Sequence, residues 1–264
     1  MEKSLLGKGD NMTYKKAPLI YVTSSKGGVG KTVFTTTLAG VYSILNLKTL
    51  IIDLDFTSGG VATILRMRQM TDIFRMHDDI INSRYSDVSN YIEHYNSMID
   101  VIAAPKDPRL GSKIDISKIL GAIEEARSKY DVILIDSKNE FTKTSLTMLG
   151  LADHILYLVT PDIIDLKNTA SFLGIMNSSG YKNIKVILND SLNDYKNYFT
   201  DYDIRTLIKT NIDYKIESSF FIKNMNSFIV EGTIAITTKK IKNSKKKDLE
   251  KFITMANSLV RKEK

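Results

Sequence analysis

The chain has 264 residues, of which 43% are hydrophobic, so it is long enough for one or two domains with a substantial buried core. It has no cysteine, which excludes disulfides and thiolate metal sites and suits a reducing cytoplasm. No apolar run reaches the roughly 20 residues of a membrane span, and the net charge of +7 allows anionic partners without identifying one.

Residues 1–17 are polar and rich in lysine. They lack the apolar centre of an export signal, so we expect a flexible leader, with Met12 as a second candidate for the natural start. The protein is accordingly expected in the cytoplasm, and peripheral binding at the inner face of the cell membrane stays open.

A glycine-rich segment follows the first apolar run, residues 19–22. Residues 24–32 read Ser-Ser-Lys-Gly-Gly-Val-Gly-Lys-Thr, and a stretch with helical spacing comes next. A strand that enters such a turn at the start of a helix predicts a phosphate-binding loop, because backbone N–H groups and the helix dipole converge on an anion. In this loop Lys31 is predicted to neutralise the β- and γ-phosphates, and the hydroxyl of Thr32 is predicted to bind Mg²⁺.

The loop departs from the pattern G-x-x-x-x-G-K-[ST], because Ser25 stands at the first position and Lys26 directly precedes two glycines. With this additional lysine, K-G-G-V-G-K-T resembles the deviant Walker A loop of the MinD/ParA class of P-loop ATPases. The resemblance implies that Lys26 reaches across a nucleotide-sandwiched homodimer to the phosphates of the partner. It also implies an ATP-binding loop made of Lys26, Gly27, Gly28, Val29, Gly30, Lys31 and Thr32.

Beyond the loop, short β-branched runs alternate with helix-patterned segments. This alternation predicts an α/β fold in which a mostly parallel sheet carries helices on both faces. The expected strands are residues 49–53, 99–103, 131–137, 154–160, 186–189 and 212–216. The expected helical regions include residues 66–95, 116–130, 201–209 and 220–230. We expect one P-loop ATPase domain over residues 18–237.

Acidic residues end two of the expected strands. Asp53 and Asp55 follow residues 49–52, and Asp136 ends the run 131–135, at the edge where open α/β sheets bind ligands. By the resemblance, Asp53 assists the Mg²⁺ shell, Asp136 is the Walker B carboxylate beside Mg²⁺, and Asp55 positions the attacking water. Lys26, Lys31 and Asp55 are therefore the catalytic candidates. From the residues alone, Asp53 and Asp55 also suit ordinary helix caps or turns.

The resemblance assigns a further role to Asn189, which ends the strand 186–189 and is expected to read the adenine edge. Two departures from the family pattern accompany these sites. Ser137-Lys138 stands where the family has Thr/Ser-Pro, and Asp190 stands where it usually has arginine.

Residues 160–169 and 180–189 look closest to the CpaE/TadZ branch, whose members localise pilus and secretion machinery. The resemblance implies an ATP-dependent dimerising switch that positions a larger machine, binds its protein partners and is reset by slow, partner-stimulated hydrolysis. Three alternatives stay open: a ParA-type DNA-partition ATPase, a MinD-type division-site ATPase and a non-hydrolysing ATP-binding scaffold.

Residues 238–264 are expected to form a basic linker followed by a C-terminal helix. The apolar stripe over 249–260 suits a helix packed on the sheet or one on a membrane surface, and we favour packing because family members usually close with such a helix. The lysine-rich run 239–247 suits a flexible connection or a docking segment. An anionic membrane or a protein is favoured over nonspecific DNA, since the run has no arginine and no aromatic residue.

Overall fold

The computed structural model describes residues 16–139, 142–192 and 198–260. Most of the expected leader, including Met12, and the last four residues of the expected C-terminal segment lie outside these ranges.

Within the described residues, eight strands form one sheet in the order β3-β4-β2-β5-β1-β6-β7-β8. All neighbouring strands are parallel except the pair β3 and β4. The strands are β1 (Leu19–Thr23), β2 (Thr49–Asp53), β3 (Glu93–His94), β4 (Ile99–Ile102), β5 (Val132–Asp136), β6 (His154–Val159), β7 (Ile184–Asn189) and β8 (Tyr214–Ile216). The six strands expected after the glycine-rich loop are all present within two residues of their expected bounds, and the predicted fold class is confirmed.

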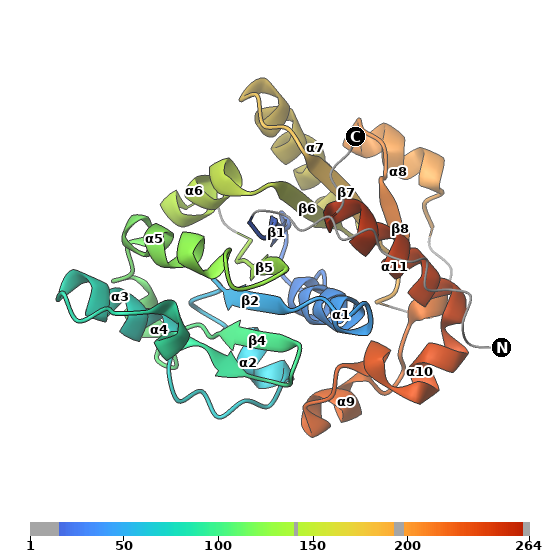
Figure 1. The fold of residues 1–264 in the computed structure, drawn as a ribbon. Helices are drawn as coiled ribbons and strands as arrows, with labels where there is room; N and C mark the ends of the chain where they lie inside the picture. Colours follow the sequence, from blue (N-terminus) through green and yellow to red (C-terminus); the bar gives the residue numbers. More distant parts are fainter. Residues whose placement is uncertain (1–15, 140–141, 193–197, 261–264) are drawn as a thin grey trace.

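Helices cover both faces of this sheet (Figure 1). The longer ones are α1 (Lys31–Ile44), α3 (Ile73–Ile81), α5 (Ile116–Ala126), α6 (Lys143–Leu151), α7 (Ile163–Ser178), α8 (Asp201–Ile208) and α11 (Lys246–Val260). The shorter ones are α2 (Gly60–Ile64), α4 (Pro108–Gly111), α9 (Met225–Glu231), α10 (Lys239–Ser244) and the 3-10 helices η1 (Val88–Tyr91), η2 (Ser218–Phe220) and η3 (Ala235–Thr237). None of the helices in the described part of the chain is long and apolar enough to cross a membrane.

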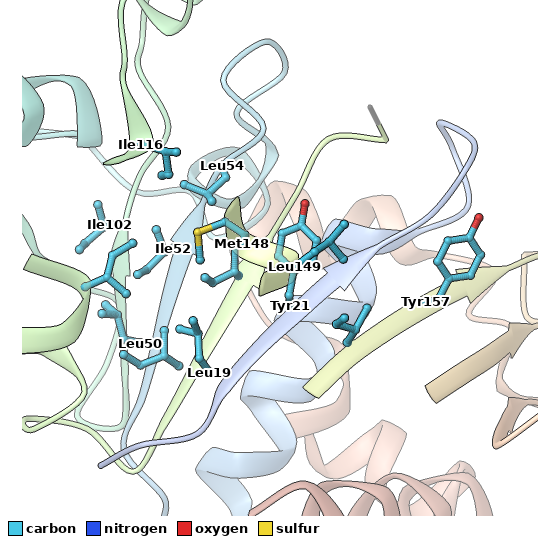
Figure 2. Close-up of a cluster of buried hydrophobic side chains, with 14 of the residues drawn as sticks. Leu19, Tyr21, Leu50, Ile52, Leu54, Ile102, Ile116, Met148, Leu149 and Tyr157 are labelled. Atoms are coloured by element: carbon cyan, nitrogen blue, oxygen red, sulfur yellow. The ribbon is translucent and has the colours of Figure 1, made fainter. Parts of the chain in front are cut away.

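The core lies in two layers, one on each face of the sheet. Leu19 and Tyr21 of β1 belong to the layer that α3, α5, α6, α7 and α8 cover, whereas Ile20 and Val22 belong to the layer that α1, α2, α10 and α11 cover. This alternation follows from the two-residue period of a strand. Figure 2 shows side chains of the first layer, among them Leu19 and Tyr21 of β1, Leu50 and Ile52 of β2, and Met148 and Leu149 of α6. Burial on both faces explains why the central strands are apolar throughout.

Two expected helical regions are interrupted. Residues 66–95 contain α3, η1, the short strand β3 and connecting turns, so the prediction of a continuous helical region is wrong there. Asp72 caps the start of α3 by accepting a hydrogen bond from the backbone N–H of Arg75, and Ser83, with φ 58°, takes the chain out of it. Residues 220–230 likewise form a helix only over α9, which ends at Gly232 in the left-handed conformation that glycine tolerates.

The basic run 239–247 is not a linker: it forms α10 and the start of α11. Thr238 caps α10, and Ile241, which is 5% exposed, anchors it in the second core layer. Lysine is a good helix former, so one buried residue and a cap suffice to order the run. Beyond it α11 packs against α1 in the second core layer. Its buried stripe consists of Phe252, Met255, Ala256 and Leu259.

Candidate functional site

The glycine-rich loop lies at the carboxyl end of β1, in the middle of the sheet, and leads into α1. β1 pairs with β5 on one side and with β6 on the other, so residues that follow all three strands can reach the loop. Gly28 has φ 78° and Gly30 has φ 91°, values that only glycine adopts without strain. A Cβ on Gly30 would also lie 3.0 Å from the side-chain nitrogen of Asn189. The loop therefore has the backbone that its sequence predicts.

Lys31 is the first residue of α1, and its side chain turns back over the loop. Its Nζ donates a hydrogen bond to Oγ of Ser24 over 3.0 Å. Burial lowers the pKa of Lys31, while the carboxylates of Asp136, Asp55 and Asp165 oppose that shift. A partly desolvated ammonium group at the start of a helix is suited to a polyanionic ligand.

Asp136, at the end of β5, is completely buried and meets two hydroxyls of α1. Oγ1 of Thr32 donates to Oδ2 of Asp136 over 2.7 Å, and Oγ1 of Thr35 donates to Oδ1 over 3.2 Å. Burial raises the pKa of Asp136 to about 6, against the opposing effects of these hydroxyls and of Lys31. The structure thus brings Lys31 and Thr32 close to Asp136, although Asp136 lies 104 residues after Thr32 in the sequence.

Asp53, at the end of β2, lies in register with Asp136 on the adjacent strand. Its two carboxylate oxygens accept hydrogen bonds from the backbone N–H of Asp55 over 3.0 Å and of Val61 over 3.1 Å. Burial, and then the charge of Asp136, raise the pKa of Asp53 well above its ordinary value. Asp53 therefore organises the following loop as well as facing the second buried carboxylate.

Asp55 is half-buried in that same loop. Its Oδ1 accepts hydrogen bonds from the backbone N–H groups of Thr57 and Ser58 over 3.2 and 3.1 Å. The loop also approaches the phosphate loop, because a Cβ on Gly60 would lie 3.1 Å from the methyl group of Thr32. Four of the residues predicted for ATP hydrolysis therefore lie at one sheet edge with Asp55, and these are Lys31, Thr32, Asp53 and Asp136.

The donor set suits Mg²⁺ held jointly with a nucleotide. In the described ranges, no cluster of three or more His, Asp or Glu side chains is arranged to hold a metal ion. Mg²⁺ commonly binds one or two carboxylates and completes its shell with phosphate oxygens and water. Thr32, Asp136 and Asp53 would hold such an ion beside the phosphates.

Asn189, at the end of β7, contacts the phosphate loop. Its side-chain nitrogen donates to the carbonyl oxygen of Val29 over 2.9 Å, and its Oδ1 accepts hydrogen bonds from the N–H and the hydroxyl of Ser191. The residue is 4% exposed. Its carboxamide thus ties β7 to the loop, and adenine recognition stays a prediction.

Lys26 points to α7 of its own chain. Its Nζ lies 3.0 Å from Oδ1 of Asp162, and both side chains are about two-fifths exposed. Asp162 caps α7 by accepting hydrogen bonds from the N–H groups of Ile164 and Asp165. The N–H of Asp165 and the ammonium group of Lys26 lower the pKa of Asp162 below its ordinary value.

Three residues of the site were not predicted from the sequence to be site residues. Thr35 is the second hydroxyl on Asp136, and its position three residues after Thr32 on the same helix is a usable signal. Ser25 and Asp165 form a hydrogen bond of 2.8 Å across 140 residues of sequence. Nothing local in either segment indicates that contact.

The chain is similar to a known family and to several known proteins. The family described as an AAA domain matches residues 17–178, which is more than half of the chain. The matched region runs from just before β1 to the end of α7 and so includes all the site residues above except Asn189.

Three relatives cover about two thirds or more of the chain. An uncharacterised ATP-binding protein of Methanocaldococcus jannaschii is 25% identical over 74% of this chain and 72% of its own length. The septum site-determining protein MinD of Thermotoga maritima is 25% identical over 65% of this chain and 63% of its own length. The chromosome-partitioning ATPase Soj of Thermus thermophilus is 23% identical over 79% of each chain.

Solved structures share the fold. A ParA family ATPase from Chlorobium tepidum superposes with a TM-score of 0.77 at 19% identity, covering 92% of this chain and 99% of the other. MinD of Pyrococcus horikoshii in complex with Mg-ADP gives 0.73 at 19% identity, with coverages of 92% and 96%. The MinC:MinD complex of Aquifex aeolicus gives 0.73 at 24% identity, with the same coverages. These similarities support the MinD/ParA class and do not single out its CpaE/TadZ branch.

Proposed function

Because the chain belongs to the family described as an AAA domain and has the fold of MinD and ParA proteins, we propose that it binds ATP with Mg²⁺ and hydrolyses it. The observation that carries this proposal is the contact between Thr32 and Asp136 directly beside Lys31. A hydroxyl and a carboxylate for Mg²⁺, and an ammonium group for the phosphates, stand together at the start of a helix.

The chemistry asks little more of the protein than positioning and charge neutralisation. Phosphoryl transfer to water passes through a state in which negative charge spreads over the transferred group and the leaving oxygen. Lys31 and the N–H groups of the loop face that charge, and bound Mg²⁺ adds positive charge on the phosphate oxygens. Asp55 lies at the same edge, and we assign it the placement of the attacking water, because its second carboxylate oxygen is not needed for the turn that its Oδ1 caps.

The position of Lys26 supports a homodimer as the active form of the protein. A lysine at the outer start of the loop reaches a second nucleotide only across a two-fold axis. In the single chain Lys26 pairs with Asp162 at the surface, and an exposed ion pair contributes little to stability. Breaking this pair so that Lys26 binds a phosphate of the second subunit therefore costs little free energy. We therefore propose an ATP-bound homodimer in which hydrolysis is slow and stimulated by a partner.

We further propose that the dimer positions a larger machine through protein partners. MinD of Aquifex aeolicus forms a complex with MinC, and this chain shares its fold. The likeness of residues 160–169 and 180–189 to the CpaE/TadZ branch points to pilus or secretion machinery. DNA partition is the second candidate, because Soj of Thermus thermophilus is a relative and α10 and α11 expose several lysines.

Replacement of Lys31 tests the nucleotide site. Lys31→Ala should weaken Mg-ATP binding at least about 30-fold, since it removes the buried ammonium group that meets the phosphates. Lys182→Ala, an exposed lysine that precedes β7 at the opposite sheet edge, is the matched control and should bind as the wild type does. Titration calorimetry with folded protein is the measurement. Equal affinities in both variants would remove the loop from the nucleotide site.

Turnover separates the ATPase from the scaffold alternative. Wild-type protein should release phosphate from ATP in the presence of Mg²⁺, and Lys31→Ala should not. A wild type that binds Mg-ATP and dimerises without releasing phosphate, even with candidate partners added, is the scaffold.

A further inference from the structure

Asp165 is a buried carboxylate that the chemistry above does not use. It lies in the first turn of α7 and is 0% exposed. Its Oδ1 accepts a hydrogen bond from Oγ of Ser25 over 2.8 Å. Its Oδ2 accepts two more, from the N–H of Thr160 over 2.7 Å and from its hydroxyl over 2.8 Å. Burying a carboxyl group costs free energy unless its oxygens are hydrogen-bonded, and both oxygens of Asp165 are.

These bonds join three segments at one point. Ser25 belongs to the phosphate loop, Thr160 directly follows β6, and Asp165 belongs to α7. Ser25 is also the residue before Lys26, whose ammonium group meets Asp162 one turn earlier at the α7 start. The beginning of the loop is therefore held to α7 by a buried link and by a surface link.

The position of Asp165 is unfavourable for a simple ligand-binding role. A carboxylate near a phosphate loop repels an anionic ligand, and Asp165 lies near enough to Lys31 to act on its charge. Its oxygens are taken by donors of this chain, so it acts on the loop by holding Ser25 and not by touching a phosphate.

We propose that Asp165 is a positioning residue for the phosphate loop: it fixes the loop start through the hydroxyl of Ser25 and couples the loop to α7. This inference rests on the proposed nucleotide site and adds a residue to it. Its consequence is that loop geometry and the α7 start change together, because both oxygens of one rigid carboxylate are engaged. Ser25, at the position where the general motif has glycine, becomes part of the loop's support.

A double-mutant cycle tests the link. Ser25→Ala removes the donor. In Asp165→Asn the single amide oxygen is needed by the two donors of Thr160, so the NH₂ group faces Ser25 and the Ser25 hydroxyl loses its acceptor. Each should weaken Mg-ATP binding by about 10- to 150-fold, the range for a hydrogen bond to a charged group. The double variant should be no weaker than the weaker single variant, because both changes break one interaction. Additive losses, or unchanged affinity in both single variants, overturn the proposal.

Two further variants separate positioning from general stability. Thr160→Val removes one bond to the other carboxylate oxygen and leaves Ser25 untouched, so it should lower the melting temperature and keep nucleotide affinity within about threefold. Ser25→Thr retains the hydroxyl and should also bind within about threefold of the wild type. A Thr160→Val protein as weak in binding as Asp165→Asn would make Asp165 merely structural.

Hydrogen exchange of the nucleotide-free protein gives a readout that does not depend on ATP. Backbone N–H groups of residues 25–30 should exchange faster in Ser25→Ala and Asp165→Asn than in the wild type or Ser25→Thr. A wild type that does not bind Mg-ATP ends the proposed function, whereas unchanged loop exchange in Ser25→Ala ends the positioning role. Should Asp165→Asn fail to fold, the Ser25 pair of variants alone decides.

Discussion

Two carboxylates, Asp53 and Asp136, face each other on adjacent strands with 0% exposure, and their titration is the clearest residue-scale property of the site. Burial raises the pKa of both. A protein without a cation at this edge therefore contains carboxyl groups that resist ionisation, and bound Mg²⁺ would favour their charged forms.

The pKa of Asp136 predicts a pH-dependent stability. It is about 6 in the folded protein against an ordinary 3.8, so the folded state holds this proton more tightly than the unfolded chain. The resulting stabilisation is complete below about pH 4 and is lost as the pH rises through about 6. Asp136→Asn should lose less stability between about pH 4 and pH 7.5, as measured by urea unfolding without nucleotide. Parallel pH profiles of the two proteins would contradict the assignment.

Asp55 gives a second residue-scale prediction, which separates binding from turnover. Asp55→Asn can still accept the hydrogen bonds from Thr57 and Ser58, so the loop should keep its shape. If the charge of Asp55 positions the attacking water, phosphate release should fall by about 10²- to 10⁴-fold while Mg-ATP affinity stays. Single-turnover assays and calorimetry on the same preparation give both quantities. Wild-type turnover in this variant would move the role to another residue.

At the scale of elements, two side-chain contacts join α7 to the phosphate loop. Asp162, the N-terminal cap of α7, forms an ion pair with Lys26 of the loop. Asp165, in the first turn of α7, accepts a hydrogen bond from Ser25, the residue before Lys26. The exposed Lys26–Asp162 ion pair can break so that Lys26 binds a phosphate of a second subunit. The buried Ser25–Asp165 hydrogen bond can hold the loop in place throughout. The two aspartates, three residues apart on one helix turn, thus differ in role because they differ in exposure.

Lys26 tests the exchange. Lys26→Gln should abolish the dimer that a slowly hydrolysed ATP analogue induces, while the monomer still binds nucleotide, because the lost charge serves the second subunit's phosphates. Lys167→Gln, an exposed lysine on α7, should dimerise as the wild type does. Analytical ultracentrifugation decides the outcome. A wild type that stays monomeric with the analogue would count against a dimerising switch.

At the scale of the whole molecule, the proposed nucleotide site and the basic helices occupy different parts of the protein. The proposed nucleotide site lies at the carboxyl edge, where β1, β2, β5 and β7 end. The basic helices α10 and α11 lie on the face that α1 also covers, with α10 at the lower right of Figure 1 and α11 above it. Dimerisation at the site would double the basic surface, so binding to an anionic partner would follow the nucleotide state.

The basic surface therefore distinguishes membrane or protein docking from DNA partition. Neutralising its exposed lysines should weaken ATP-dependent sedimentation with phosphatidylserine vesicles, because each lysine near such a surface contributes about 1 kcal/mol. The residues to change are Lys239, Lys240, Lys246 and Lys247. The matched control changes four exposed lysines elsewhere, Lys106, Lys113, Lys118 and Lys182.

Titration with random duplex DNA at two salt concentrations completes that experiment. Tight, ATP-dependent binding that falls steeply with salt and disappears only in the first variant would make DNA partition the better function. Vesicle binding lost in that variant, with weak DNA binding throughout, supports a membrane-docked positioning protein.

Local signals in the sequence determined the fold class, the phosphate loop and the acidic strand ends. Strand and helix periods act over a few residues, and the glycines, Lys31 and Thr32 of the loop are neighbours, so these features are readable without a structure. The order of Asp53 and Asp136 after apolar runs placed both at the ligand edge for the same reason.

Only the tertiary structure decided which distant groups meet. Asp165 reaches Ser25 across 140 residues of sequence, and a buried carboxylate has no local signature that distinguishes it from a helix-cap residue. The run 239–247 is helical because Ile241 finds a place in the core and Thr238 caps it, whereas its lysines alone suggest a solvated segment. Contacts of this kind depend on how elements pack, and packing is set by the whole chain.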